Sequence, residues 1–132
     1  MNLMLFRGLA SRLLLSKRKV KEETEVISVT ETLFLTDADN GKTYSLDSAI
    51  ARVYIPARAS LTTGWSITVK TTVPEYNRYV SSVEVGDGVV NFEGDPWDGV
   101  SMDSLDAMAT ITFNGTSFDA VAIAGAVSGY WD

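Results

Sequence analysis

The stretch ATITFNGTSFDAVAIAG, residues 109–125, decides the fold of this chain. Asn114-Gly115 is the strongest short hairpin signal that a sequence can carry, because Asn and Gly accept the positive φ of a tight turn. The runs on either side, 109–113 and 116–125, are rich in β-branched and aromatic residues. This stretch therefore predicts a β-hairpin.

Outward from this hairpin, the chain after Glu25 reads as short β-prone runs separated by turn formers. Gly86-Asp87-Gly88 predicts a second tight hairpin, and helical turns are expected only around Asp47–Ala51 and near Met102–Met108. No internal repeat is apparent. Many short strands at regular spacing predict an all-β fold, a single antiparallel β-sandwich or barrel-like domain. The runs are EVISV, TETLFLT, KTYSL, ARVYIP, WSITVKTTV, YVSSVEV and VVNF.

The composition allows one globular domain and argues against catalysis. The 132 residues fit a single domain, and 45% hydrophobic with 21% charged residues is close to the globular average. There is no cysteine and no histidine, which removes disulfides, thiolate metal sites and every Ser-His or Cys-His nucleophile. The sequence therefore predicts a protein that is not an enzyme and that uses no cofactor.

Charge divides the chain into two parts. Residues 1–21 hold six of the 11 basic residues, whereas all 17 acidic residues lie from Glu22 onward. The first part therefore carries +6, and the remainder, with five basic and 17 acidic residues, carries −12. This split predicts a basic N-terminal arm, residues 1–24, and an acidic β domain, residues 25–132. An acidic domain repels nucleic acid, so direct nucleic-acid binding is not expected.

The arm reads as a short amphipathic helix over residues 1–16, MNLMLFRGLASRLLLS. At 100° per residue one face carries the apolar residues Leu5, Phe6, Leu9, Ala10, Leu13 and Leu14. Arg7 and Arg12 lie opposite, although Met4 and Leu15 intrude on that polar side. A helix this short is marginal alone, so it needs a surface to lie against. The predicted partner-binding residues are Leu5, Phe6, Arg7, Leu9, Arg12, Leu13, Leu14, Lys17, Arg18 and Lys19.

Several other functions of the arm compete with docking on a partner. Arginines interrupt the apolar run and KRKVK follows it, which argues against a secretory signal and a membrane span. A mitochondrial presequence, an interfacial membrane helix and a helix packed on its own domain remain open. The favoured prediction is docking on a different subunit, without a membrane.

Motifs for metal or sugar chemistry are weak. Residues 37–41, DADNG, fail the calcium-loop pattern and predict a turn. Acidic residues gather at 93–106. A cation site and a pair of carboxylates for glycoside hydrolysis are alternatives for this segment. The favoured prediction is a solvated acidic loop, and no metal is predicted. Asn114-Gly-Thr116 fits a glycosylation sequon, but the hairpin explains it. Trp97 and Trp131 are candidates for a sugar platform, whereas Trp65 is expected to be a buried anchor.

Residues 33–72, LFLTDADNGKTYSLDSAIARVYIPARASLTTGWSITVKTT, resemble a recurring module of tailed-phage virion proteins. Residues 109–125 are similar to the closing hairpin of that module, so the resemblance covers 27–127. Such modules occur in capsid decoration (cement) proteins, head fibres and tail-fibre attachment domains. The resemblance implies a β-sandwich or barrel, often trimeric, without enzymatic activity.

The resemblance and the arm together predict a capsid decoration protein on the surface of a phage head. Its partner would be the major capsid protein, which it binds through the arm as a homotrimer, stabilising the assembled head. Two alternatives stay open: a tail or head-fibre adaptor of the virion, and a carbohydrate-binding β-sandwich using Trp97 or Trp131.

Overall fold

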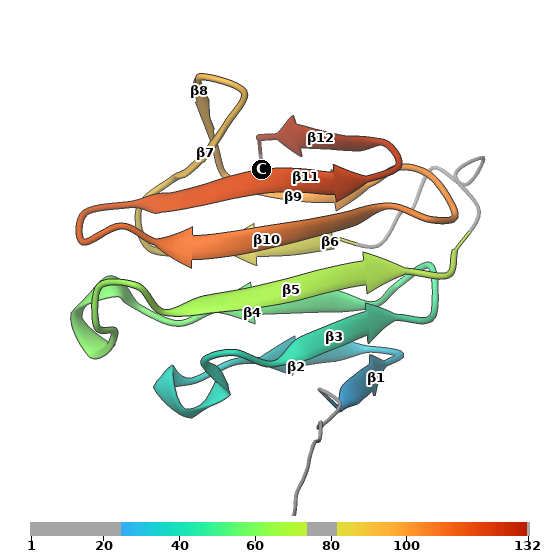
Figure 1. Cartoon of the computed structure of the whole chain (residues 1–132), viewed down its shortest axis with the longest axis horizontal. Helices are drawn as coiled ribbons and strands as arrows, with labels where there is room; N and C mark the ends of the chain where they lie inside the picture. The colour runs from blue at the N-terminus through green and yellow to red at the C-terminus, as the bar shows by residue number, and fades with distance from the viewer. Residues whose placement is uncertain (1–24, 74–81, 132) are drawn as a thin grey trace, which may run out of the picture.

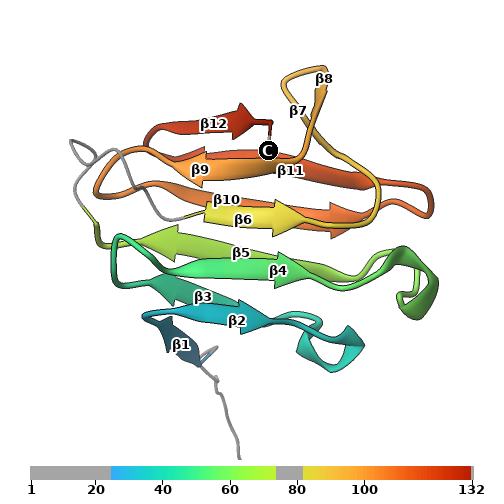
Figure 2. The ribbon, with the colours of Figure 1, turned by 180° about the vertical axis from the view of Figure 1, so that it is seen from behind.

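The computed structural model describes residues 25–73 and 82–131, and these form a β-sandwich of two sheets (Figures 1 and 2). The all-β prediction is confirmed for these residues, whose only helices are the single 3-10 turns η1 (Asp37–Asp39) and η2 (Arg58–Ser60). The predicted N-terminal helix lies outside the described residues.

One sheet has seven strands and the other has five. The seven-stranded sheet runs in the order β1 (Val26–Val29), β3 (Thr43–Leu46), β5 (Ser66–Thr71), β10 (Met108–Phe113), β11 (Phe118–Ala124), β7 (Val90–Phe92) and β8 (Asp95–Trp97). The five-stranded sheet runs in the order β12 (Val127–Tyr130), β9 (Gly99–Met102), β6 (Ser82–Val85), β4 (Arg52–Ile55) and β2 (Thr32–Phe34).

The expectation of an antiparallel sandwich is wrong, because both sheets are mixed. β3 pairs in parallel with β1 and β5, β4 pairs in parallel with β2 and β6, and β7 pairs in parallel with β11. The reason is that β1 to β6 alternate strictly between the two sheets. A chain that crosses to the other sheet and returns runs in its original direction, so its neighbour in the same sheet is parallel.

The predicted hairpin at Gly86–Gly88 is also wrong. β6 belongs to the five-stranded sheet and β7 to the seven-stranded sheet, so this segment is a crossover between sheets. The Asp87 carboxylate holds the crossover in place by accepting the Arg58 backbone N–H at 2.8 Å and its guanidinium at 3.2 Å. A crossover and a hairpin use the same turn residues, so the local sequence does not separate them.

The Asn114-Gly115 hairpin is confirmed between β10 and β11, which pair up to Phe113↔Phe118. The Asn114 Oδ1 atom accepts the backbone N–H groups of Thr116 and Ser117, both at 2.9 Å. Gly115 has a φ of 105°, which favours glycine. The side chain of Asn114 thus replaces backbone partners inside the turn.

No helix forms at the two predicted helical turns. Residues 47–51 and 103–107 are instead single turns, closed by hydrogen bonds from Ala51 N–H to the Ser48 carbonyl and from Ala107 N–H to the Ser104 carbonyl. Each turn carries the chain from one sheet to the other. The predicted turn at 37–41 is confirmed and contains η1.

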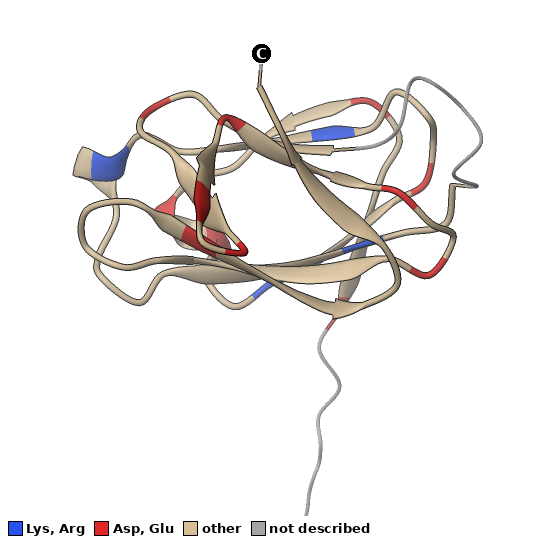
Figure 3. Ribbon diagram, turned by 90° about the horizontal axis from the view of Figure 1, so that it is seen from above, with Lys and Arg blue, Asp and Glu red and all other residues tan. Residues whose placement is uncertain are grey.

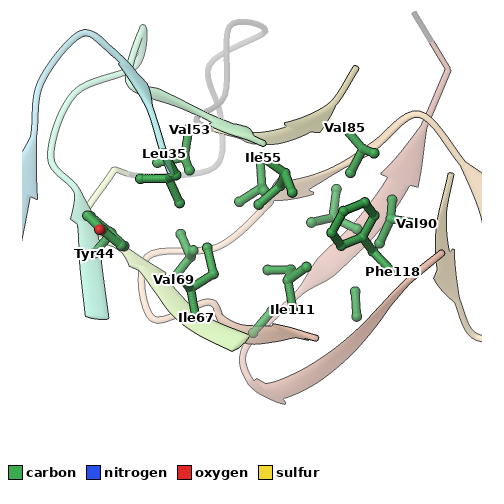
Figure 4. Packing of buried hydrophobic residues seen from close by; sticks show 14 of the residues in the cluster. Leu35, Tyr44, Val53, Ile55, Ile67, Val69, Val85, Val90, Ile111 and Phe118 are labelled. Carbon is green, nitrogen blue, oxygen red and sulfur yellow. The ribbon is translucent and has the colours of Figure 1, made fainter. Parts of the chain in front are cut away.

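The core lies between the two sheets (Figure 4). Alternate residues of β5 and β10 point inward, which leaves Ile67, Val69 and Ile111 buried against Val53 and Ile55 of the opposite sheet. Trp65 is buried, as expected. β5 and β10 alternate between buried and partly exposed residues, whereas all residues of β6 and β9 are buried. The outward side chains of the other strands and the sheet edges are therefore the surfaces available for binding.

Candidate functional site

The predicted partner-binding residues of the arm, Leu5 to Lys19, lie outside the described residues. The described chain starts at Glu25 and enters the sandwich through β1, the outer strand of the seven-stranded sheet. In Figure 1 the blue β1 lies at the opposite side of the molecule from the red strands β11 and β12. The arm therefore joins the domain far from its C-terminal strands.

Acidic residues outnumber basic ones in the part of the chain that the structure describes, as the red and blue segments of the ribbon in Figure 3 show. The few basic residues of this part mostly face carboxylates. Lys42 lies 3.3 Å from Asp39, and Arg58 lies 3.2 Å from Asp87. Arg52 lies 3.3 Å from Glu84, which is only 9% exposed. Three of the four basic side chains that the structure describes, Lys42, Arg52 and Arg58, thus form ion pairs within the domain. The cationic surplus of the chain lies in residues 1–21.

The sequence favours a solvated loop for the acidic segment 93–106, but the structure forms strands and turns there. Glu93 and Gly94 form the two-residue turn of the β7–β8 hairpin, with φ values of 55° and 88°. The rest of the segment supplies β8, β9 and the turn after β9. No group of three or more carboxylates in 25–73 and 82–131 is arranged to hold a metal ion.

Two carboxylates close the corners where the chain changes sheets. Asp47 accepts hydrogen bonds from the hydroxyls of Ser28, Ser45 and Thr72, and its backbone N–H donates to Val29 at 2.8 Å. The hydrogen bonds from Ser28 and Ser45 hold the pKa of this carboxyl below its ordinary value. The Asp47 carboxylate therefore makes hydrogen bonds within the fold rather than binding a ligand.

Asp103 repeats this arrangement at the second corner. It accepts hydrogen bonds from the hydroxyls of Ser101 and Ser128, and its backbone N–H donates to the Ala126 carbonyl at 2.8 Å. The two corners share the pattern Ser-aliphatic-Asp-Ser at 45–48 and 101–104. A pattern of only four residues is too short to stand out as an internal repeat. The Asp two residues after a Ser is nevertheless visible in the sequence at both corners.

The structure brings together two of the three tryptophans. The ring centroids of Trp97 and Trp131 lie 5.1 Å apart with a tilt of 42°. Trp97 packs against the backbone of Gly129, where a Cβ would overlap the indole, and Trp131 remains 59% exposed. Trp131 therefore presents an exposed aromatic surface, and the ring of Trp97 packs against it.

The outer face of the five-stranded sheet carries a second aromatic group. Phe34 stacks on Tyr54 at 4.8 Å and is 71% exposed. Tyr130 lies over Gly99, at which an added Cβ would meet the tyrosine ring at 2.6 Å. Phe34, Tyr54, Glu84, Gly99 and Tyr130 occupy one row across the sheet.

The apolar run near the C-terminus is exposed rather than buried. Residues 121–126 are all exposed, with Val121 at 60% and Ile123 at 55%. Residues 120–131, AVAIAGAVSGYW, contain no charged side chain. The structure thus places the first part of this uncharged run, residues 121–126, at the surface.

A shallow hollow of about 230 Å³ lies at one end of the sandwich, lined by Asp37, Asn40 and residues 62–65. The Asn40 Oδ1 atom already accepts the Ser66 backbone N–H at 2.8 Å. The hollow is therefore part of a loop scaffold, and the exposed tryptophan and the C-terminal strands are the stronger candidate surfaces.

Comparison with known proteins adds no family to these observations. No protein-family model matches the chain, and no curated protein is significantly similar to it in sequence. Within the described residues, no helix has the length and apolar character needed to cross a membrane. The fold and the surfaces define the class as a small mixed β-sandwich with exposed apolar and aromatic groups.

Proposed function

We propose that this chain is a structural protein of a phage virion, a capsid decoration (cement) protein that binds the major capsid protein through residues 1–24 and stabilises the assembled head without catalysis. The resemblance of residues 33–72 and 109–125 to virion modules supports this proposal. These residues belong to β2 through β5 and to the β10–β11 hairpin of the sandwich.

The placement of the two ends carries the proposal. The arm joins the domain at β1, on one side of the molecule, and β11 and β12 lie at the opposite side (Figure 1). Trp131 directly follows β12 in the chain. A protein anchored by its first strand would hold its far side away from the shell. Residues 1–21 carry +6 and residues 22–132 carry −12, so an acidic shell would attract the arm and orient the domain outward.

The arm has enough apolar surface to act as an anchor. Its predicted face contains Leu5, Phe6, Leu9, Ala10, Leu13 and Leu14. Burial of such a face against the shell would contribute about 10 kcal/mol before the cost of ordering is subtracted, at about 1.5–3 kcal/mol for each large side chain. Each further copy in an oligomer would add another arm to the attachment.

The test is co-sedimentation of the full chain with phage heads assembled without it. Leu9→Asp with Leu13→Asp places charge in the proposed contact and is expected to abolish sedimentation with heads. Ser11→Asp adds a carboxylate to the opposite face and serves as the matched control, with binding largely kept. Binding of the Leu9 and Leu13 double variant at the level of the unchanged chain would refute the arm as the anchor.

Carbohydrate binding is a second candidate, favoured by the contact between Trp97 and Trp131. An exposed indole supported by a second indole provides a flat apolar surface for the face of a pyranose ring. Titration calorimetry with a panel of neutral and acidic oligosaccharides tests this candidate. Binding that is lost in Trp131→Ala and kept in Phe34→Ala, the matched exposed aromatic, would support it, and no heat from any saccharide would exclude it.

A further inference from the structure

The strand β11 has an open edge. It runs for seven residues, but β7 pairs only with its first two, through Phe118↔Val90 and Asp119↔Asn91. Figure 1 shows β7 crossing beside the start of β11 and turning away. Within the described part of the chain, no strand pairs with residues 120–124 on the side opposite β10.

The backbone direction shows which groups face this edge. The Phe118 N–H donates to the Val89 carbonyl at 3.0 Å, so it points toward the β7 side of the strand. Alternation along a strand places the N–H groups of Ala120 and Ala122 on the same side. These groups and their carbonyls form a short row to which another strand can add.

This edge lacks the features that usually protect one. β8, the outermost strand of the same sheet, carries Asp95 and Pro96, which discourage pairing. The edge of β11 has neither charge nor proline, and its exposed side chains include the β-branched Val121 and Ile123. Such side chains favour cross-strand packing in a sheet.

We propose that a second copy of this chain covers the edge, with β11 of each copy paired antiparallel to β11 of the other around a two-fold axis. The argument for a second copy is electrostatic. The domain, residues 25–132, has five basic and 15 acidic residues and so carries −10. Two such domains repel one another wherever their carboxylates meet, whereas residues 120–131 bring no charge to the contact. The same uncharged edge is complementary to itself, as a two-fold interface requires.

The dimer is an addition to the proposed function. The resemblance to virion modules implies a trimer, whereas an edge that pairs with itself joins two copies. Molecular mass in solution therefore separates the two. Attachment to heads through the arm does not depend on the outcome.

The first experiment is sedimentation equilibrium of the full chain from about 5 to about 100 μM, since a reversible dimer depends on concentration. The unchanged chain is expected to approach the mass of two copies. Val121→Glu and Ile123→Glu place like charges across the two-fold axis and are expected to weaken the dimer by about tenfold or more. Phe34→Glu is the matched control, because Phe34 is also exposed but lies on β2 of the other sheet.

The second experiment tests backbone pairing. Ala122→Pro removes the N–H that faces the open edge, whereas Ala122→Ser keeps it. The proline variant is expected to be monomeric and the serine variant dimeric, with circular dichroism melting used to check that both are folded. A full chain that stays monomeric at about 100 μM, a trimer, or a dimer that survives Val121→Glu and Ile123→Glu would overturn the inference.

Discussion

Asp47 and Asp103 occupy the same position in two corners of the sandwich. Asp47 lies where the chain leaves β3 of the seven-stranded sheet for β4, and Asp103 lies where it leaves β9 of the five-stranded sheet for β10. Each carboxylate accepts the hydroxyl of the serine two residues earlier and that of a serine on a neighbouring strand. The two crossings run in opposite directions between the sheets and use the same hydrogen bonds.

Removal of either carboxylate is expected to destabilise the domain. Asp47→Ala and Asp103→Ala should each lower the free energy of unfolding by about 1–3 kcal/mol, because the serine hydroxyls lose their acceptor. Asp106→Ala is the control, since Asp106 is an exposed carboxylate in the same turn as Asp103. Urea denaturation measures the difference. Equal losses in all three variants would show that the corners are held by other contacts.

The corner at Asp47 also predicts a dependence of stability on acid. Its hydroxyl partners lower the pKa of the folded carboxyl below the value of 3.8 that is ordinary for Asp. The folded state then binds a proton less readily than the unfolded state. The stabilisation is present above about pH 4 and is lost as the pH falls through the folded pKa. Free energies of unfolding measured from pH 7 downward should therefore fall less steeply in Asp47→Asn than in the unchanged chain.

Gly129 is expected to tolerate no side chain. A methyl group there would displace the Trp97 indole from β12, so Gly129→Ala should lower the free energy of unfolding by about 1–3 kcal/mol and change the tryptophan fluorescence. Gly86→Ala is the matched control, because an added Cβ at that position meets no atom within 4 Å. Equal unfolding midpoints in urea for the two variants would contradict this prediction. They would show that the Trp97 indole can move away from residue 129 without a loss in the free energy of unfolding.

The β10–β11 turn depends on the amide of Asn114. Asn114→Ala removes the acceptor for two backbone N–H groups and should lower the free energy of unfolding by about 1–3 kcal/mol. Thr116→Ala removes only one hydroxyl donor to the same oxygen and should cost less. Thermal unfolding followed by circular dichroism compares the two. A larger loss in Thr116→Ala would contradict this account of the turn.

The basic residues of the arm are expected to act mainly at low salt. Replacement of Lys17, Arg18 and Lys19 by Ser should weaken co-sedimentation with heads at low ionic strength and change it little at high ionic strength. The reason is that exposed ion pairs are screened by salt, whereas the apolar contact is not. A loss of binding that is independent of salt would mean that these side chains are buried in the contact.

Some of the candidate surface was readable from the sequence. The absence of charge from residues 120–131 is read directly from the sequence, and the structure exposes Val121 and Ile123 within this run. The contact between Trp97 and Trp131 was not predictable, because 33 residues and four strands separate them along the chain. Their approach depends on β12 lying in the opposite sheet from β8.

The sequence by itself did not predict β8, β9 or β12, but it determined the other nine of the twelve described strands, the hairpin at Asn114-Gly115 and the inward positions of Trp65 and Ile67. These depend on turn dihedrals and on the two-residue period of a strand, which are local properties. Only the tertiary structure decided which sheet each strand joins. The turns at Gly86–Gly88 and at Asn114-Gly115 have similar local chemistry, yet one crosses between sheets and the other stays within one. That choice depends on how all twelve strands bury their apolar faces together, which no short segment encodes.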